Sequence, residues 1–394
     1  MNIRSVLDKM IAARASDLHL KAGTAPVVRV DGVLYTLDDA PPSAQDLRDV
    51  CDQLLNEEQR QYFSTHNEID FAFGVAGLAR FRANIFMQRG TVALALRHVP
   101  VEVPSIDDLH LPPVVRELAF SPRGLILVTG RTGSGKSTTL AAMIDAINRV
   151  TTRNVITVED PIEFLHRDRM SFIHQREVGL DTQSFMDGLR YVLRQDPDII
   201  LVGEIRNIET MNTALMAADT GHLVMSTLHT TDVVQTLQRI ISFYPPHQHE
   251  EVRLSVASNL RAVISQRLIP RKDAAGRVPA VEVMMSTPTI REYILNPEKT
   301  PLLHSVVAEG VTQYGMQTFD QSVLGLLRDS VITEEEALKN CNNPNELSLK
   351  LKGISAASDR TWQPVDEAKG DITPGLGSTL GAPAGARPGI GRRE

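Results

Sequence analysis

The sequence predicts an α/β protein in two domains, a small N-terminal α+β domain and a larger domain built on a mainly parallel sheet. The chain has 394 residues, which is more than one ordinary hydrophobic core accommodates. Apolar residues make up 42% and charged residues 23%, a composition that excludes disorder of the whole chain. Beyond about Leu109, apolar runs typical of buried strands alternate with helical segments.

Residues 1–98 have the pattern of a small α+β domain. The segment begins with a helical pattern and continues into short alternating stretches such as VVRVDGVLYTL, whose central DG fits a hairpin turn. The stretch RFRANIF alternates with period two, which places Arg80, Arg82 and Asn84 on one polar face of a strand.

A linker and a larger domain follow. Pro100 and Pro104 interrupt regular structure, and we expect a linker at 99–108. The larger domain is predicted at 109–352, where GLILVTG, NVITVED, DIILVGE and HLVMSTLHT suit strands buried on both faces. From about Val233 the chain is predicted to be mostly helical, with SVASNLRAVISQRLI as its clearest amphipathic stretch. Residues 353–394 are rich in Gly, Pro, Ala and Ser, which predicts a disordered tail without a packed core.

Charge and cysteine content narrow the function classes. The net charge of −7, with arginines spread along the chain, argues against nucleic acid as the main partner. Cys51 and Cys341 stand far apart, which argues against a zinc site or a disulfide framework. The first twenty residues carry charges every few positions, and no apolar run approaches a membrane span. We therefore expect a protein that stays in the cytoplasm, where docking on a membrane complex through protein contacts is still open to it.

The strongest chemical signal is a complete GxxxxGK[ST] phosphate-binding loop, GRTGSGKS, between the strand GLILVT and the helix STTLAAMIDAIN. Its glycines let backbone N–H groups converge on phosphate oxygens at a helix N-terminus. Lys136 is expected to reach the β- and γ-phosphates, and Ser137 to bind Mg²⁺. The plainer interpretation is a glycine-rich turn with a surface lysine. The nucleotide-binding candidates are Gly130, Thr132, Gly133, Ser134, Gly135, Lys136, Ser137 and Thr138.

Polar side chains also follow other predicted strands, and ligands of parallel sheets bind beyond the carboxyl ends of strands. Glu163 comes after NVITVED, Glu204 and Arg206 come after DIILVG, and His229 ends LVMSTLH. Glu204 suits an acid that holds Mg²⁺ or its waters, and Glu163 suits one that polarises the attacking water. Each acid has a plainer interpretation as a helix cap or turn residue, and His222, which begins a strand, as a hydrogen-bonded core histidine.

Taken together, the segments resemble a known family. GRTGSGKST, VEDPIEF, LRQDPDIILVGEIRNIET and GHLVMSTLHT are similar to the Walker A, Asp box, Walker B and His box of secretion and type IV pilus ATPases. ASDLHL, RFRANIFMQRG, VISQRLIP and GMQTFDQ extend the resemblance to retraction ATPases of the PilT and PilU type over about residues 1–350.

The resemblance implies a function and a set of roles. It implies a hexameric, ATP-hydrolysing motor that powers pilus retraction and twitching motility, with a PAS-like N-terminal domain and a RecA-like ATPase domain. Glu163 would be the catalytic base, Glu204 would support Mg²⁺, and His222 and His229 would sense the γ-phosphate and link the domains. Arg206 is a further nucleotide-binding candidate.

The resemblance also implies partners and a second group of catalytic residues. Arginines of the N-terminal domain would complete the nucleotide site, and the candidates are Arg80, Arg82 and Arg97. The implied partners are five further copies of the chain, an inner-membrane pilus platform protein and a paralogous retraction ATPase. The place of work would be the cytoplasmic face of the inner membrane.

Two single positions and one six-residue segment depart from the family pattern. Arg131 stands where Pro is usual, Asn207 stands where the Walker B segment normally ends in Asp, and the retraction motif AIRNLI is represented by TIREYI at 289–294. The first two lie outside the phosphate-contacting positions. The third leaves open whether the chain is a principal retraction motor or an accessory paralogue, and EEEALKNCNNPNEL favours the paralogue.

Two alternative functions remain open from sequence. One is a pilus assembly or type II secretion ATPase, which usually has a larger N-terminal region and a four-cysteine metal insertion. The other is a nucleotide-binding structural subunit of a ring that has no turnover of its own. Glu163 beside an intact phosphate-binding loop favours hydrolysis.

Overall fold

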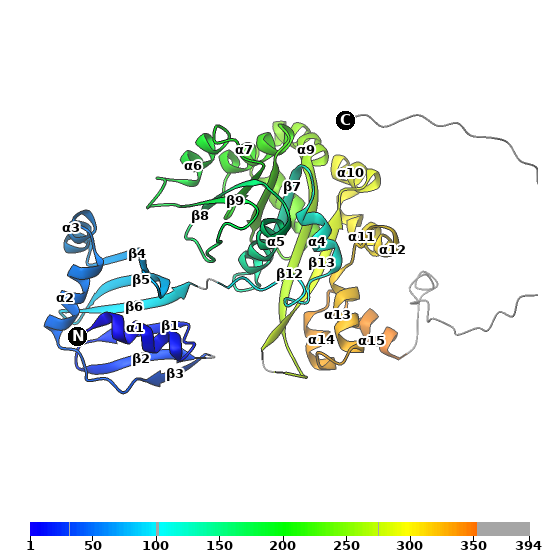
Figure 1. The fold of residues 1–394 in the computed structure, drawn as a ribbon. Coiled ribbons are helices and arrows are strands. Elements are labelled where there is room, and N and C mark those ends of the chain that lie inside the picture. The colour runs from blue at the N-terminus through cyan, green and yellow to red at the C-terminus, as the bar shows by residue number, and fades with distance from the viewer. Residues whose placement is uncertain (31, 100–101, 275, 353–394) are drawn as a thin grey trace, which may run out of the picture. The chain divides into compact units, whose positions relative to one another are not determined.

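The structure is a computed structural model that describes residues 1–30, 32–99, 102–274 and 276–352 (Figure 1). Residues 1–347 group into one unit by their mutual contacts. The predicted disordered tail, 353–394, lies outside the described residues.

The N-terminal region contains a six-stranded sheet with the order β3-β2-β1-β6-β5-β4. Every neighbouring pair is antiparallel, and the predicted hairpin joins β2 to β3, with Val30 opposite Val33. The strands are β1 Asp17–Lys21, β2 Thr24–Val30, β3 Val33–Thr36, β4 Glu68–Val75, β5 Ala79–Gln88 and β6 Thr91–Val99; the helices are α1 Ile3–Ala12, α2 Ala44–Leu54 and α3 Glu57–His66.

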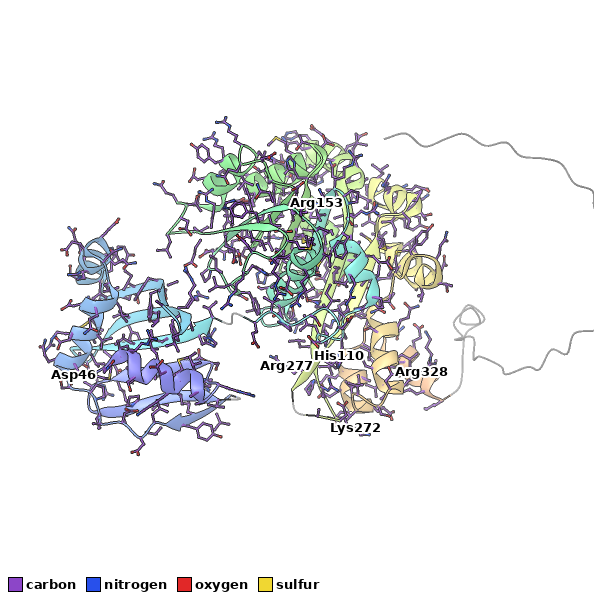
Figure 2. The ribbon with its side chains drawn as sticks, viewed as in Figure 1. Asp46, His110, Arg153, Lys272, Arg277 and Arg328 are labelled. Carbon is purple, nitrogen blue, oxygen red and sulfur yellow. The ribbon has the colours of Figure 1, made fainter. Side chains whose placement is uncertain are left out.

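Local capping explains where these helices begin. The side chain of Asn2 accepts from the backbone N–H of Ser5 at the start of α1, and Ser43 with Asp46 forms a capping box at α2. The Met1 ammonium also donates to Asp46 (Figure 2). These bonds satisfy N–H groups that have no partner inside the helix.

The two faces of the N-terminal sheet differ in character. Phe81, Ala83 and Ile85 of β5 are buried and pack in a hydrophobic cluster with residues of α1 and α2. Because side chains alternate along a strand, Arg80 and Arg82 lie on the opposite face, as predicted. The likeness of this domain to a PAS domain stays a prediction.

The larger sheet has seven strands in the order β13-β12-β7-β11-β10-β8-β9. All pairs are parallel except β12 with β13, which are antiparallel. The four strands predicted from apolar runs are confirmed as β7, β8, β10 and β11. The bounds are β7 Gly124–Thr129, β8 Asn154–Glu159, β9 Phe172–Glu177, β10 Ile199–Val202, β11 Leu223–Leu228, β12 Leu260–Pro270 and β13 Arg277–Met285.

Helices cover both faces of this sheet (Figure 1). Successive residues of β7 belong to different hydrophobic clusters: Leu125 and Leu127 to one, Ile126 and Val128 to the other. The helices are α4 Pro113–Ala119, α5 Lys136–Val150, α6 Phe185–Val192, α7 Ile208–Asp219, α8 Val233–Ser242, α9 His249–Asn259, α10 Pro288–Leu295, α11 Leu303–Glu309, α12 Val311–Tyr314, α13 Phe319–Arg328, α14 Glu334–Asn340 and α15 Pro344–Leu351, with 3-10 turns at Pro246–Gln248 and Thr300–Leu302.

One sequence prediction is wrong in this region. The amphipathic stretch SVASNLRAVISQRLI is helical only as far as Asn259, and its remainder forms β12 between β7 and β13. Val263 and Ile264 are fully buried there. β-branched residues fit a strand that has partners on both sides, so sheet pairing overrides the helix-like spacing.

Candidate functional site

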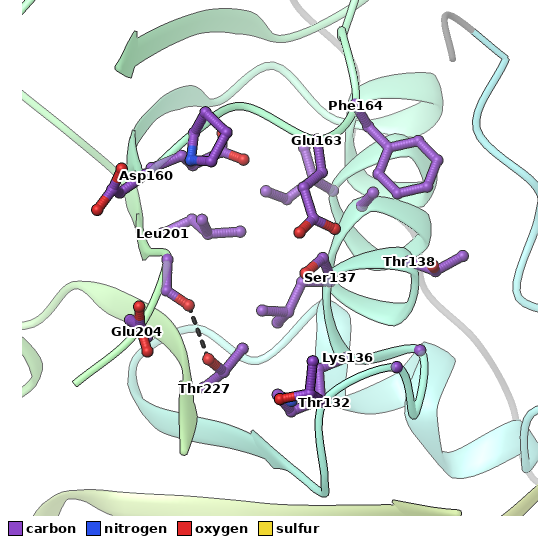
Figure 3. A pocket seen from close by; sticks show the side chains of 18 of the residues that line it. Thr132, Lys136, Ser137, Thr138, Asp160, Glu163, Phe164, Leu201, Glu204 and Thr227 are labelled. Carbon is purple, nitrogen blue, oxygen red and sulfur yellow. Dashed lines mark hydrogen bonds between the residues drawn. The ribbon is translucent and has the colours of Figure 1, made fainter. Parts of the chain in front are cut away.

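Four neighbouring strands bring the predicted polar segments to one edge of the sheet. β7, β11, β10 and β8 lie side by side and run parallel, so their carboxyl ends and the loops after them meet. Together these loops line a cavity of about 470 Å³ (Figure 3). The phosphate-binding loop contributes Thr132, Gly133, Gly135, Lys136, Ser137 and Thr138 to its lining.

The backbone of the phosphate-binding loop requires glycine at its first position. Gly130 has φ of +146°, and a Cβ there would lie 2.4 Å from the Ser134 hydroxyl oxygen and 2.6 Å from the Gln266 carbonyl oxygen. Both distances are far below contact, so any side chain would push the loop away from β12. Ser134 is buried behind the loop rather than in the cavity lining.

Lys136 is held in place by the loop that it follows. Its side chain is 8% exposed, and Nζ donates to the carbonyl oxygens of Gly130 at 3.0 Å and Arg131 at 3.2 Å. Burial lowers the pKa of Lys136, and the charges of Glu163 and Glu204 oppose this shift. The ammonium group therefore lies between backbone oxygens and within the field of two carboxylates.

Glu163 is an exposed carboxylate in the cavity lining. Figure 3 shows it pointing toward Ser137, the first residue after Lys136 on α5. Among the residues that the structure describes, no hydrogen bond or ion pair occupies this carboxylate, so it is available to a ligand or a water molecule.

Glu204 lies opposite, after β10. Its carboxylate forms an ion pair with Arg206, and its Oε2 lies 3.3 Å from Nε2 of His229. Thr227 Oγ1 donates to the carbonyl oxygen of Gly203 at 2.8 Å and thereby joins the ends of β11 and β10 (Figure 3). Glu204 and His229, predicted separately, therefore lie in contact at one point of the cavity.

His222 lies at the other end of the sheet. It immediately precedes β11, and its carbonyl oxygen accepts from Gly124 at the start of β7. The six residues of β11 separate it from the cavity, about 20 Å at the usual rise per residue. Its Nδ1 contacts Ala217 O at 2.9 Å and Thr220 Oγ1 at 3.1 Å. The prediction that His222 contacts nucleotide is therefore corrected for a nucleotide held by the same chain.

Two residues of β9 that belong to none of the sequence motifs support the Glu163 loop. Gln175 Nε2 donates to the Phe164 carbonyl oxygen at 2.8 Å and to Glu159 at 3.2 Å. Glu177 is 4% exposed and accepts from the backbone N–H of Ile162 at 3.2 Å. Gln175 and Glu177 stand two positions apart in FIHQRE, and this spacing was the sequence signal that both lie on one face of a strand.

Half-buried Glu159 belongs to the same support. It accepts from Thr157 Oγ1 at 2.6 Å as well as from Gln175. Burial raises the pKa of Glu159, although these hydrogen bonds oppose the shift. Glu159 thus has fixed partners inside the protein, in contrast to exposed Glu163.

The three candidate arginines of the N-terminal region have different surroundings. Arg80 Nη2 donates to Glu177 Oε2 at 3.1 Å, and Arg97 Nε donates to Asp17 Oδ1 at 2.8 Å while contributing to the cavity lining. Arg82 lies opposite Arg97 on the neighbouring strand and is exposed. In the described part of the chain, Arg82 has no ion-pair or hydrogen-bond partner.

Two departures from the family pattern have simple structural accounts. Asn207 caps α7 by accepting from the Thr210 backbone N–H at 2.9 Å, a role that Asn and Asp fill equally well. Arg131 is exposed and lines a second cavity together with Arg267, Arg277 and Lys339. Leu268 of β12 and Arg277 of β13 also line the main cavity; Arg277 is labelled in Figure 2.

Comparison with known proteins agrees with this geometry. Residues 96–325 match the family model described as type II/IV secretion system protein. The chain belongs to this family. It is 42% identical to the type IV pilus retraction ATPase PilT of Pseudomonas aeruginosa, over 87% of this chain and 99% of that protein. It is 39% identical to the type IV pilus ATPase PilU of the same organism, over 91% of this chain and 93% of that one.

A solved structure extends the agreement to three dimensions. The crystal structure of the pilus retraction motor PilT with bound ADP superposes on this secretion-family chain with a TM-score of 0.83 and 43% identity, covering 88% of this chain and 99% of that one. The resemblance to retraction ATPases drawn from the sequence boxes is thus confirmed.

Proposed function

We propose that the chain is an ATP-hydrolysing motor that retracts type IV pili and so powers twitching motility. The observation that carries the proposal is the meeting of Lys136, Ser137, Glu163 and Glu204 in one cavity. This occurs in a chain that matches a retraction ATPase over nearly its full length. The division into domains at 1–98 and 109–352, with a linker at 99–108, is part of the proposal. Separate hydrophobic clusters below residue 97 and above residue 105 support it.

The phosphate-binding loop would hold the triphosphate of ATP. Gly133 and Gly135 have φ of +78° and +90°, a conformation that turns backbone N–H groups inward. Lys136 would exchange its bonds to Gly130 O and Arg131 O for the β- and γ-phosphates. The ammonium group would then neutralise phosphate charge instead of bonding the loop's own carbonyl oxygens.

Glu163 would act as the general base. A carboxylate that protein donors leave free can accept a proton from water, provided that it lies within hydrogen-bond reach of that water. The bonds of Gln175 and Glu177 to residues on either side of Glu163 fix the loop, so the carboxylate keeps its place as nucleotide enters and leaves.

The residues present also fit a divalent cation. Mg²⁺ prefers oxygen ligands and usually keeps several waters beside one or two protein groups, and Ser137 and Glu204 supply a hydroxyl and a carboxylate in the cavity. We propose that these two residues hold the ion. When bound, Mg²⁺ neutralises phosphate charge as it builds up during transfer.

A further cation is proposed to come from the N-terminal domain. Arg80 and Arg97 have carboxylate partners within the chain, whereas Arg82 is exposed and free among the described residues. Arg82 is therefore the strongest candidate to reach a γ-phosphate, in the same chain or in a neighbouring copy. Domain motion would then be coupled to hydrolysis.

We expect Arg82→Ala to bind ATP nearly normally and to hydrolyse it roughly three decades more slowly, the loss seen when an arginine finger is removed. Steady-state phosphate release and a nucleotide-binding titration measure the two quantities. Arg48→Ala on α2 is the matched control, since Arg48 is exposed and, in the described part of the chain, bonds only Gln45 on its own helix. If the Arg82, Arg80 and Arg97 variants all turn over at the wild-type rate, the N-terminal domain takes no part in the chemistry.

The assembly and its surroundings are proposed from the same resemblance. We propose a homohexamer that docks on an inner-membrane pilus platform protein, with a paralogous retraction ATPase as a further partner and no nucleic acid partner. Among the described residues, no helix is long and apolar enough to cross a bilayer. Work at the cytoplasmic face of the inner membrane, through protein contacts, accords with that finding.

α10 bears on the choice between principal motor and accessory paralogue. Ile290 and Ile294, which survive from the retraction motif, are buried in the core, whereas Arg291 is exposed and bonds Ser286 Oγ at 3.2 Å. The retained isoleucines thus have a packing role. The motif diverges only at positions around that packing, and this divergence favours the accessory paralogue over the principal motor.

A deletion strain tests the proposed function. If the chain retracts pili, the strain should keep or gain surface pili and lose twitching movement. Loss of surface pili would instead favour an assembly ATPase. Purified protein that binds ATP but releases no phosphate in the presence of Mg²⁺ would favour a structural ring subunit.

A further inference from the structure

A buried carboxylate on β13 has no part in the site described above. Glu282 is 0% exposed, and burying a charged group is costly unless partners compensate it. Glu282 nevertheless lies on β13, which pairs with β12, the neighbour of β7. Glu282 lies opposite Ser265 on β12, and Ser265 lies opposite Thr129, the residue that immediately precedes the phosphate-binding loop.

One oxygen of Glu282 holds the beginning of α8. Oε2 accepts from the backbone N–H of Val233 at 2.8 Å, the first residue of that helix. An N–H group at this position has no partner within the helix, and a carboxylate there also interacts favourably with the helix dipole. Glu282 therefore fixes the N-terminus of α8 against β13.

α8 in turn fixes the segment that carries His229. Three residues join His229 to Val233, and two of them are tied to the helix: Thr230 bonds Thr236 at 2.7 Å, and Asp232 accepts from the Gln235 N–H at 2.8 Å. His229 contacts Glu204 at the cavity. The segment is thus held at one end by Glu204 and at the other by Glu282.

The second oxygen of Glu282 faces a histidine. Oε1 has no directed hydrogen bond among the described residues, but it lies 3.2 Å from Nδ1 of His304 on α11. The His304 side chain is 40% exposed, so it can exchange protons with solvent. Arg267 also interacts with Glu282, while its own N–H groups donate to Asn340 O and Asn342 Oδ1.

We propose that Glu282 is a positioning residue for the proposed ATP hydrolysis, holding His229 in place through α8, and that protonation of His304 strengthens this hold. The proposal rests on the proposed function, because it needs hydrolysis as its readout. It adds a link from α11, in the C-terminal helices, to the nucleotide cavity.

The charges around His304 determine the direction of the pH effect. The groups that face it are acidic: Glu282 on β13, Asp232 at the start of α8 and Asp320 on α13. Contact with Glu282 raises the pKa of His304, and partial burial opposes this shift. A raised pKa means that the charged pair is complete at low pH and is lost as pH rises through the folded-state value. The hold on α8 should therefore weaken as pH rises.

His304→Asn is the main test. Asn can place an amide N–H where Nδ1 of His304 stood, but it carries no charge. We measure kcat, KM for ATP and thermal midpoint from pH 6 to pH 9 in the full chain. The kcat ratio of wild type to variant should be roughly three- to tenfold near pH 6, the scale of a capping interaction, and approach one at pH 9. KM for ATP should change little, since His229 is not part of the phosphate-binding loop that would hold the triphosphate.

His247→Asn, at an exposed histidine in the 3-10 turn Pro246–Gln248, is the matched control and should show a ratio near one throughout. Glu282→Gln keeps an acceptor for Val233 but removes the charge, so it should abolish the same pH-dependent component. The double variant Glu282→Gln/His304→Asn should then be no slower than Glu282→Gln alone.

The outcomes separate the two proposals. A wild-type chain without ATP hydrolysis overturns the proposed function. Where the wild type hydrolyses ATP, a kcat ratio that does not vary with pH, or additive effects in the double variant, overturns the positioning role. A pH-dependent difference in thermal midpoint without any difference in kcat also overturns it, because it assigns the Glu282–His304 pair to stability alone.

Discussion

Glu163→Gln is expected to bind ATP with nearly wild-type affinity and to hydrolyse it roughly two to four decades more slowly, the usual cost of losing a general base. The amide keeps the shape of the side chain and cannot accept a proton. The loop itself should stay in place, because Glu177 and Gln175 bond the backbone of Ile162 and Phe164 rather than the Glu163 carboxylate.

Single-turnover phosphate release and fluorescent-nucleotide binding measure chemistry and affinity separately. Glu250→Gln in the first turn of α9 is the control, because it removes an exposed carboxylate of the same type that takes no part in the cavity lining. Turnover within a few-fold of wild type would assign the base to another residue. Asp160 would be the next candidate, since it lines the same cavity.

The part of the site predicted from sequence depends on local pattern. β7, β8, β10 and β11 are continuous apolar runs, and such runs identify strands buried on both faces wherever they occur. The phosphate-binding loop is likewise one contiguous segment. Once parallel strands are placed, their carboxyl ends must meet, which is why the sequence alone assigns Glu163, Glu204 and His229 to one edge of the sheet.

The remainder depends on pairings that a local pattern does not contain. The sequence pattern of β12 predicts a helix, and the segment forms a strand because it pairs with β7 on one side and β13 on the other. His222 and His229 stand seven positions apart in one segment, yet a strand separates them, so one lies in the cavity and the other at the opposite end of the sheet. Glu177 and Glu282 are buried carboxylates whose importance rests on partners 15 and 49 positions away.

Lys136 provides the second prediction with a large expected effect. Its ammonium group is buried against two backbone carbonyl groups and lies in the field of Glu163 and Glu204. A bound triphosphate would bring several negative charges into this cavity, beside two carboxylates that already repel them. Lys136 is the buried cation of the cavity lining, among the described residues, that can match that charge.

Lys136→Ala should therefore abolish measurable ATP hydrolysis and weaken nucleotide binding by at least about tenfold, since charge-assisted bonds to phosphate are among the strongest in proteins. The fold should survive, because the two carbonyl groups that lose Nζ can be hydrated through the open cavity, and an unchanged thermal midpoint checks this. Lys9→Ala on α1 is the control, because it removes an exposed lysine that pairs with Asp39 and lines neither the main cavity nor the second cavity. Lys136→Arg is informative as well: it keeps the charge but replaces a compact ammonium with a planar, wider group, so it should retain part of the binding and lose most of the turnover. Normal phosphate release by Lys136→Ala would place the nucleotide elsewhere in the chain and remove the basis of the proposed motor.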